Sequence, residues 1–292
     1  MTSRVTVGLD GSSQSAAAAR WAAREAELRS ASLDLVHAEE WLDDPLFPAA
    51  TTEERQRWAE GVLHDIAAEL RRDHPALEIA TRRVGGLPSL ALASAAKDSD
   101  MLVLGSRGLG SVAGFLVGST GSATIAESER PVVLVRSAGR TEETPSDSVP
   151  ERGPVVAGLD VGRPCDRLLA FAFEEAARRD GRLIVVHGWS LPPILSYAPA
   201  LDPGVYAEME HGIDTALDEI LSPWREKFPS VTVEPRLTIG QAAIQILDAA
   251  SGAALVVVGR RIRHTALGTH IGPITHAVMH HATSPVAVVA HD

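Results

Sequence analysis

Cysteine is almost absent from this chain of 292 residues, which contains Cys165 alone. An intramolecular disulfide is therefore excluded, and the composition favours a reducing, cytoplasmic setting. Cys165 could serve as a nucleophile or be a small residue near the start of a helix. Ordinary cysteine usage favours the second interpretation.

Long apolar runs and an excess of positive charge are missing too. No apolar stretch approaches the roughly 20 residues that a membrane-spanning helix needs. The first residues, MTSRVTVGLD, lead directly into a strand and lack the apolar core of a signal peptide. The formal net charge is -11 and the sequence pI is about 5.5, whereas a general nucleic-acid binder needs a basic field. We therefore expect a cytoplasmic protein with no membrane span and no nucleic-acid partner.

The chain also lacks familiar catalytic signatures. It contains neither the G-x4-G-K-[S/T] phosphate loop nor an H-E-x-x-H zinc motif, and no nucleophile stands beside an evident base. His276 and His280 are one turn apart on an expected helix, a spacing that suits Zn²⁺, but a third ligand is not evident. The paired acids Glu39–Glu40, Glu53–Glu54 and Glu174–Glu175 are typical of solvated faces and loops. We expect no catalytic residue and no metal site.

What the chain does have is a regular alternation of strands and helices. In the first half, apolar strand patterns at 4–9, 33–38, 77–84, 100–104 and 131–136 alternate with helical patterns at 15–28, 52–73, 88–97 and 119–128. Such alternation predicts a parallel, doubly wound sheet.

A polar stretch and an internal repeat divide the chain. Residues 138–152 have no apolar period and are rich in Pro, Ser and Glu, which predicts a linker between domains at 1–137 and 153–292. Asp160 repeats Asp10 and His187 repeats His37, both at an offset of 150. Beyond the second helix the offset becomes 154, and it pairs Gly86, Gly105, Gly118 and Pro131 with Gly240, Gly259, Gly272 and Pro285. Constant offsets over two blocks indicate a tandem duplication.

Glycines crowd the segment after the fourth strand, MLVLGSRGLGSVAGFLVGSTGS at 101–122. Glycine lets backbone N–H groups point into one concavity, and the Gly118–Ser119 pair stands where a helix is expected to begin. These glycines, like Asp10 and His37, follow the carboxyl ends of strands, where an open α/β sheet binds its ligands. We expect a phosphate-binding crevice there. The alternative is that these residues are turns that only close the strands.

These motifs carry a resemblance to a known family. The first half contains G-x2-G-x9-G-[S/T] in full, at Gly105, Gly108, Gly118 and Ser119. With Asp10 and the VHA strand end, the chain resembles the universal stress protein family in its tandem two-domain form, over nearly all of its length outside the linker. The resemblance implies an α/β fold of two tandem flavodoxin-like, Rossmann-like domains, each a five-stranded parallel sheet with helices on both faces. It also implies a role in stress response or dormancy.

The resemblance further implies that ATP is the ligand. The phosphates would lie on residues 105–110 and on Gly118–Ser119, Asp10 would hold the adenosine end, and the backbone of residues 36–38 would receive adenine. The expected cofactor-binding residues are Gly8, Asp10, Val36, His37, Ala38, Gly105, Ser106, Arg107, Gly108, Leu109, Gly110, Gly118, Ser119 and Thr120. Arg107 can add positive charge beside phosphates, and Mg²⁺ near Asp10 or Ser119 is a candidate companion of ATP.

The second half departs from the motif. Ile262 stands where the second motif glycine would be, and Pro273 stands in place of the Ser or Thr. A β-branched residue resists positive φ, and proline offers neither an N–H group nor a hydroxyl. Charge could come instead from Arg260, Arg261 and Arg263. The residues that remain for a weaker second site are Asp160, His187, Gly259, Arg260 and Gly272. We expect this half to bind ATP weakly or not at all, and to pair with the first half.

The predicted function is an ATP-binding regulatory stress-response protein, in which nucleotide occupancy biases domain or dimer surfaces. The apolar fifth strands at 132–135 and 286–289 need partners, so we expect the two halves to pair through them. A homodimer and an unidentified protein partner are further candidates. Two alternatives stay open: a slow ATP hydrolase and a ligand-free dimeric scaffold. Trp41 and Trp189, which follow the second strands, could pack over an adenine edge or fill the core.

Overall fold

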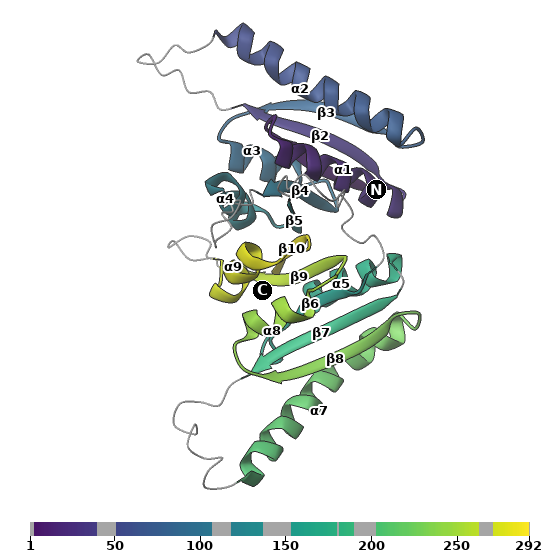
Figure 1. The fold of residues 1–292 in the computed structure, drawn as a ribbon, viewed down its shortest axis with the longest axis vertical. Helices are drawn as coiled ribbons and strands as arrows, with labels where there is room; N and C mark the ends of the chain where they lie inside the picture. The colour runs from purple at the N-terminus through teal and green to yellow at the C-terminus, as the bar shows by residue number, and fades with distance from the viewer. Residues whose placement is uncertain are drawn as a thin grey trace, which may run out of the picture. The chain divides into compact units, whose positions relative to one another are not determined.

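The computed structural model of this chain describes residues 3–39, 51–106, 118–136, 153–179, 181–189, 203–262 and 271–291. These residues form two compact units (Figure 1), one with strands β1 to β5 and one with strands β6 to β10. Among the described helices, none is both long enough and apolar enough to cross a membrane.

The first unit is a parallel sheet covered by helices on both faces. Its elements are β1 (Arg4–Leu9), α1 (Ser13–Leu28), β2 (Ser32–Glu39), α2 (Thr52–Asp73), β3 (Ile79–Gly85), α3 (Pro88–Ala95), β4 (Met101–Ser106), α4 (Ser119–Glu127) and β5 (Val132–Arg136). The strand order is β3-β2-β1-β4-β5, with parallel neighbours. The chain steps outward from β1 to β3 and then returns to β4. Right-handed crossovers therefore place α1 and α2 on one face and α3 and α4 on the other.

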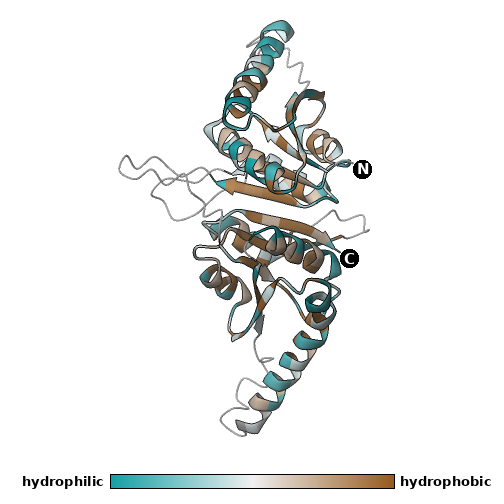
Figure 2. Ribbon diagram, turned by 90° about the vertical axis from the view of Figure 1, so that its right-hand side faces the viewer, coloured by the Kyte–Doolittle hydropathy of each residue, from teal (hydrophilic) through white to brown (hydrophobic). Residues whose placement is uncertain are grey.

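Strands β1, β2, β4 and β5 are mostly buried on both faces, which explains their largely apolar sequences, whereas the edge strand β3 is mostly exposed. In β1, for example, Val5 and Val7 are fully buried. The alanine-rich α1 can lie close to the sheet because Ala18, Ala22 and Ala26 are small and fully buried. Figure 2 shows the resulting contrast between the hydrophobic strands and the largely hydrophilic α2.

The second unit repeats this architecture. Its elements are β6 (Val155–Gly158), α5 (Asp166–Arg178), β7 (Arg182–Trp189), α7 (Pro203–Lys227), β8 (Thr232–Ile239), α8 (Ala242–Ala249), β9 (Leu255–Arg261), α9 (Pro273–His281) and β10 (Val286–His291). Read from β8, the order β8-β7-β6-β9-β10 is that of the first unit. Phe173 of α5 packs against Trp224 and Phe228, with ring centroids 5.8 and 5.6 Å away, and so joins α5 to the end of α7. The sequence repeat is therefore a repeat of structure.

The repeat extends to single turns. Gly86 and Gly240 both have a positive φ, +125° and +136°, a conformation that only glycine adopts readily. The N–H of Gly86 donates to the carbonyl oxygen of Glu39 at 3.0 Å, and that of Gly240 donates to the carbonyl oxygen of Trp189 at 2.9 Å. Each glycine thus fastens the end of the second strand of its unit to the turn that enters the next helix.

A buried ion pair is repeated as well. Glu25 accepts from Arg29 at 2.7 Å in α1, and Glu175 pairs with Arg179 at the end of α5. The side chain of Glu175 is completely buried, whereas that of its neighbour Glu174 is 45% exposed. The prediction that both acids lie on a solvated face is therefore wrong for Glu175. A carboxylate can be buried there because the arginine four residues later lies on the same side of the helix.

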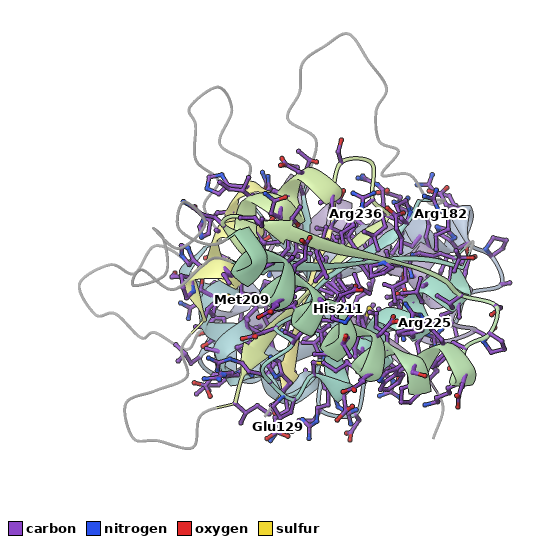
Figure 3. All side chains as sticks on the ribbon, turned by 90° about the horizontal axis from the view of Figure 1, so that it is seen from below. Glu129, Arg182, Met209, His211, Arg225 and Arg236 are labelled. Carbon is purple, nitrogen blue, oxygen red and sulfur yellow. The ribbon has the colours of Figure 1, made fainter. Side chains whose placement is uncertain are left out.

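Other charged side chains cover the outside of the second unit (Figure 3). Arg225 of α7 donates to Asp218 at 2.7 Å, and Arg236 of β8 donates to Glu234 at 2.8 Å. Both pairs are well exposed to solvent, so each contributes little to stability.

Candidate functional site

The carboxyl ends of β1 and β2 are joined by a histidine. Leu9, the last residue of β1, pairs in register with His37 of β2. The Nδ1 atom of His37 lies 2.8 Å from the carbonyl oxygen of Leu9, and the imidazole is buried. His37 therefore fixes the point at which Asp10 leaves the sheet.

Asp10 begins a tight turn that leads into α1. Its Oδ1 accepts from the N–H of Ser12 at 3.0 Å and also from the hydroxyl of Ser12. The Ser12 hydroxyl in turn accepts from the N–H of Ser15 at 3.1 Å, which caps the first turn of α1. Gly11, which lies between Asp10 and Ser12, has φ +77°. The first turn of α1 thus has a side-chain cap from its own chain, and the exposed Asp10 carboxylate lies beside that helix end.

The backbone of Ala38 lies just past the end of β1. The carbonyl of Glu39 accepts from the N–H of Gly86, on the β3 side of β2. Backbone groups alternate between the two sides of a strand, so those of Ala38 point toward the β1 side. In the register, β1 has already ended there at Leu9. In the register of the described strands, Ala38 therefore has no partner on β1, and its backbone groups are candidates to bind a ligand next to Asp10.

Gly105 belongs to β4, because β4 continues through Ser106 and does not end at residue 104 as the sequence suggested. A Cβ on Gly105 would lie 2.5 to 2.7 Å from backbone atoms of Gln14 and Ser15. Close packing of β4 against the first turn of α1 therefore requires this glycine. The buried Ser106 hydroxyl donates to the carbonyl of Val135 at 3.3 Å.

Arg136 supplies a cation at the same edge of the sheet. It pairs in register with Ser106, at the ends of β5 and β4. Burial lowers the pKa of its guanidinium to about 10. The group therefore stays charged at neutral pH, although water hydrates it less than a surface arginine.

Gly118 is the N-cap of α4, and its own surroundings do not demand glycine. Its φ of -58° and ψ of 157° suit any residue. A Cβ there would meet no atom of the described residues within 4 Å. The exposed Ser119 and Thr120 follow in the first turn, where helix N–H groups have no partner inside the helix. Glycine offers no side-chain oxygen to cap this end, so the site suits an external anion.

Four expected residues of the glycine segment, Arg107, Gly108, Leu109 and Gly110, lie outside the described residues. Trp41 and Arg263 lie outside them too. Gly8 lies within β1, where a Cβ would come within 2.8 Å of the Leu104 side chain. This contact gives Gly8 a packing role beneath the site.

Besides Arg136, sequence reasoning missed Trp58 of α2. Its ring centroid lies 5.5 Å from that of His37 in an edge-to-face arrangement. Trp58 is 54% exposed, although α2 buries Ala59 and Leu63. Trp58 lies outside this apolar stripe. A large aromatic residue on the polar side of an expected helix was the sequence feature that could have identified it.

Known proteins resemble this chain in sequence and in fold. The model of the universal stress protein family matches residues 1–136 and, again, residues 151–290. The chain belongs to the universal stress protein family. A universal stress protein of Mycolicibacterium smegmatis is 33% identical over 296 residues, with 98% of this chain and 96% of that protein covered. One from Mycobacterium tuberculosis is 31% identical over 297 residues, with 97% and 95% covered. The crystal structure of a universal stress protein from Archaeoglobus fulgidus, 17% identical, covers 99% of this chain and 98% of its own with a TM-score of 0.71, which shows a common fold.

The second unit of this universal stress protein keeps the histidine contact, but the turn after its aspartate has a different sequence. The Nδ1 atom of His187 lies 3.0 Å from the carbonyl oxygen of Leu159. Asp160 accepts from the N–H of Gly162 at 3.1 Å and from Nε of Arg163 at 2.6 Å. Position 163 corresponds to Ser13 in the first unit. The second acid thus has a cationic partner from its own turn.

The glycines of the second unit also have different neighbours. A Cβ on Gly259 would lie 2.4 Å from the His291 ring, and the Gly259 carbonyl accepts from the Thr275 hydroxyl at 2.6 Å. Gly272 caps α9 with φ -64° and ψ 157°, as Gly118 caps α4, but Pro273 follows it. Proline removes one first-turn N–H group, so this end of α9 offers less to an anion than α4 does.

Several other residues singled out in the sequence are buried or paired within the second unit. Trp189 is buried, which agrees with core filling and leaves its ring no room over a ligand. Arg260, a candidate source of charge for the weaker second site, is buried, at 3% exposed. Ile262 donates its N–H to the carbonyl of His291 at 2.8 Å and so continues the pairing of β9 with β10. His276 and His280 stack with centroids 4.2 Å apart, but no three metal-binding side chains come together among the described residues.

Cys165 precedes α5 at its N-cap position, as expected for a small residue near a helix start. Burial raises the pKa of its thiol from 9.0 to about 11, and the carboxylates of Asp166 and Asp160 add to the effect. The thiol is therefore protonated at neutral pH and is a poor nucleophile.

Proposed function

We propose that this universal stress protein binds ATP in its first unit and that the bound nucleotide regulates its association surfaces. The contrast between two helix N-termini at one edge of the sheet carries the proposal. The first turn of α1 is capped by Ser12, whereas α4 begins at Gly118, a position that its described neighbours leave open to any side chain. A glycine that no described neighbour requires, at the start of a helix, is well suited to a bound phosphate.

The remaining groups of the site match the other parts of ATP. The backbone of Ala38 offers hydrogen bonds to adenine, and the carboxylate of Asp10 can accept from ribose hydroxyls. The N-terminus of α4 would receive the phosphates, and the Arg136 cation would offset part of their charge. Mg²⁺ would arrive with the phosphates, because it usually binds through nucleotide phosphates and one or two protein oxygens.

The two units have unequal roles in this proposal. We take residues 1–137 and 153–292 as the domains, joined by 138–152. Asp160 has Arg163 as its partner and Pro273 replaces a donor, so the second domain binds nucleotide weakly or not at all. We further propose that the fifth strands pair the two halves, and that the second domain responds to ATP through this pairing, through a homodimer or through a protein partner. In the cytoplasm, occupancy of the site would then report the energy state of the cell.

Titration calorimetry with Mg-ATP tests the proposal with matched pairs of variants. Asp10→Ala and Gly118→Ala should abolish binding, whereas Asp160→Ala and Gly272→Ala should leave it unchanged. Gly118 and Gly272 share one backbone conformation and open surroundings among the described residues, so an added methyl group has the same local effect in both. Equal effects within each pair, or no binding by the unmodified protein, would overturn the proposal and leave a ligand-free scaffold. Steady phosphate release that Asp10→Ala abolishes would favour a slow hydrolase.

A further inference from the structure

Trp58 is a large aromatic side chain that the fold leaves half exposed beside the candidate site. The core-facing side of α2 consists of Ala59, Leu63, Ala67 and Leu70, each at most 5% exposed. Trp58 is 54% exposed and points elsewhere. Burial in the core therefore does not explain why this position is tryptophan.

The indole nevertheless has a defined seat. Its ring meets His37 edge to face, at a centroid distance of 5.5 Å and an interplanar angle of 76°. It also lies against Gly11, where a Cβ would come within 2.7 Å of the indole carbon Cζ2. Trp58 thus rests on the carboxyl ends of β1 and β2, directly beside Asp10.

Both members of this contact are replaced in the second unit. Within the long helix, the buried Leu63 of α2 matches the buried Leu217 of α7 at an offset of 154, which places Gly212 at the position of Trp58. The offset of 150 places Val161 at that of Gly11. Gly212 has open space within 4 Å among the described residues. The aromatic ring and the glycine that makes room for it therefore occur together, and only in the half that carries the complete glycine motif.

We propose that Trp58 is the stacking surface for the nucleobase and makes the first unit prefer purine over pyrimidine nucleotides. The inference rests on the proposed nucleotide site. An exposed indole face stacks on a base, and a two-ring purine covers more of it than a one-ring pyrimidine. The order along the sheet is consistent: Ala38 lies in β2, with Trp58 against its neighbour His37, Asp10 follows β1, and Gly118 comes after β4 in the chain.

The test compares ATP, CTP and inorganic tripolyphosphate as ligands of the full chain. For Trp58→Ala we expect about a tenfold or greater loss of ATP affinity, no change for tripolyphosphate, and loss of the preference for ATP over CTP. Trp58→Phe should restore most of the ATP affinity. Leu28→Ala is the control, because Leu28 is also half exposed, at 46%, but lies at the far end of α1.

The possible failures are distinguishable. If the unmodified protein binds neither ATP nor tripolyphosphate, the proposed function itself is wrong. If it binds ATP, and Trp58→Ala binds it equally well with unchanged selectivity, the nucleotide site stands and the stacking role is wrong. Equal losses for ATP and tripolyphosphate in Trp58→Ala would also overturn the stacking role, because they would indicate general damage to the site.

Discussion

The Nδ1 atom of His37 lies 2.8 Å from the carbonyl oxygen of Leu9, and the second unit repeats this contact between His187 and Leu159 at 3.0 Å. A carbonyl oxygen only accepts hydrogen bonds, so Nδ1 carries the proton in both rings. The repeated histidine therefore has a structural task, which is to tie the first two strands together where an aspartate follows. In the first unit that aspartate is Asp10, the candidate ribose ligand.

His37→Phe and His187→Phe test this role. Phenylalanine keeps an aromatic ring but cannot donate to the carbonyl, so each variant should lose about 1 kcal/mol of stability. Chemical denaturation measures that loss. Only His37→Phe should also weaken ATP binding, because only its contact positions Asp10. An equal loss of ATP binding in His187→Phe would contradict the assignment of the site to the first unit.

An added methyl group should reduce the stability of the protein strongly at Gly105 and only slightly at Gly118. Gly105→Ala places a Cβ within 2.5 to 2.7 Å of the α1 backbone and should cost about 1–3 kcal/mol or more. Gly118→Ala meets no described atom within 4 Å, so its effect on the unfolding free energy should be much smaller. Thermal unfolding compares the two. Similar stabilities would mean that β4 and α1 do not pack as described.

Gly118→Asp separates helix stability from phosphate binding. Aspartate is a good N-cap and carries a charge that suits a helix N-terminus, so stability should stay the same or rise by about 0.5 kcal/mol. The same carboxylate would repel phosphate and should abolish ATP binding. Gly272→Asp is the matched control, with the same expected gain in stability and unchanged ATP affinity. Retention of ATP by Gly118→Asp would show that phosphates do not bind at α4.

Glu175 should matter for stability far more than its neighbour Glu174. Glu175→Gln removes the negative charge that pairs with the 4% exposed Arg179 side chain, and breaking a buried pair in this way costs about 3–5 kcal/mol. Glu174→Gln removes only a loose contact with Arg178, at 3.6 Å, and should change stability by less than about 0.5 kcal/mol. Urea unfolding of both variants measures the difference. Comparable midpoints would contradict the buried position of Glu175.

Cys165 should be slow to react with thiol reagents. Burial raises the pKa of its thiol to about 11, from 9.0, so the folded protein forms the reactive thiolate only at a higher pH than the unfolded chain. At pH 8 we expect slow labelling by an aromatic disulfide reagent, and fast labelling once the protein is unfolded in urea. Fast labelling of the folded protein at pH 8 would show that the thiol is neither buried nor suppressed.

The sequence predicted the fold well because its signals were local and repeated. Apolar runs such as those of β1 and β4 mark strands buried on both faces, and the offsets linking Asp10 to Asp160 and Gly118 to Gly272 predicted two copies of one unit. The contacts of Gly105 and Glu175 were not predicted, because a spacing pattern does not reveal which neighbour a residue meets. Trp58 was missed for the same reason. Its place beside Gly11 and His37 arises only when α2 packs onto the sheet.

The most direct test of the central claim is the nucleotide content of the freshly purified protein. The protein would be denatured, and the released small molecules identified and counted by ion-exchange chromatography. We predict close to one ATP per chain, absent from Asp10→Ala and Gly118→Asp and retained in Gly272→Asp. Two nucleotides per chain would contradict the unequal roles of the two units. None, with no binding of added Mg-ATP, would contradict the nucleotide site altogether.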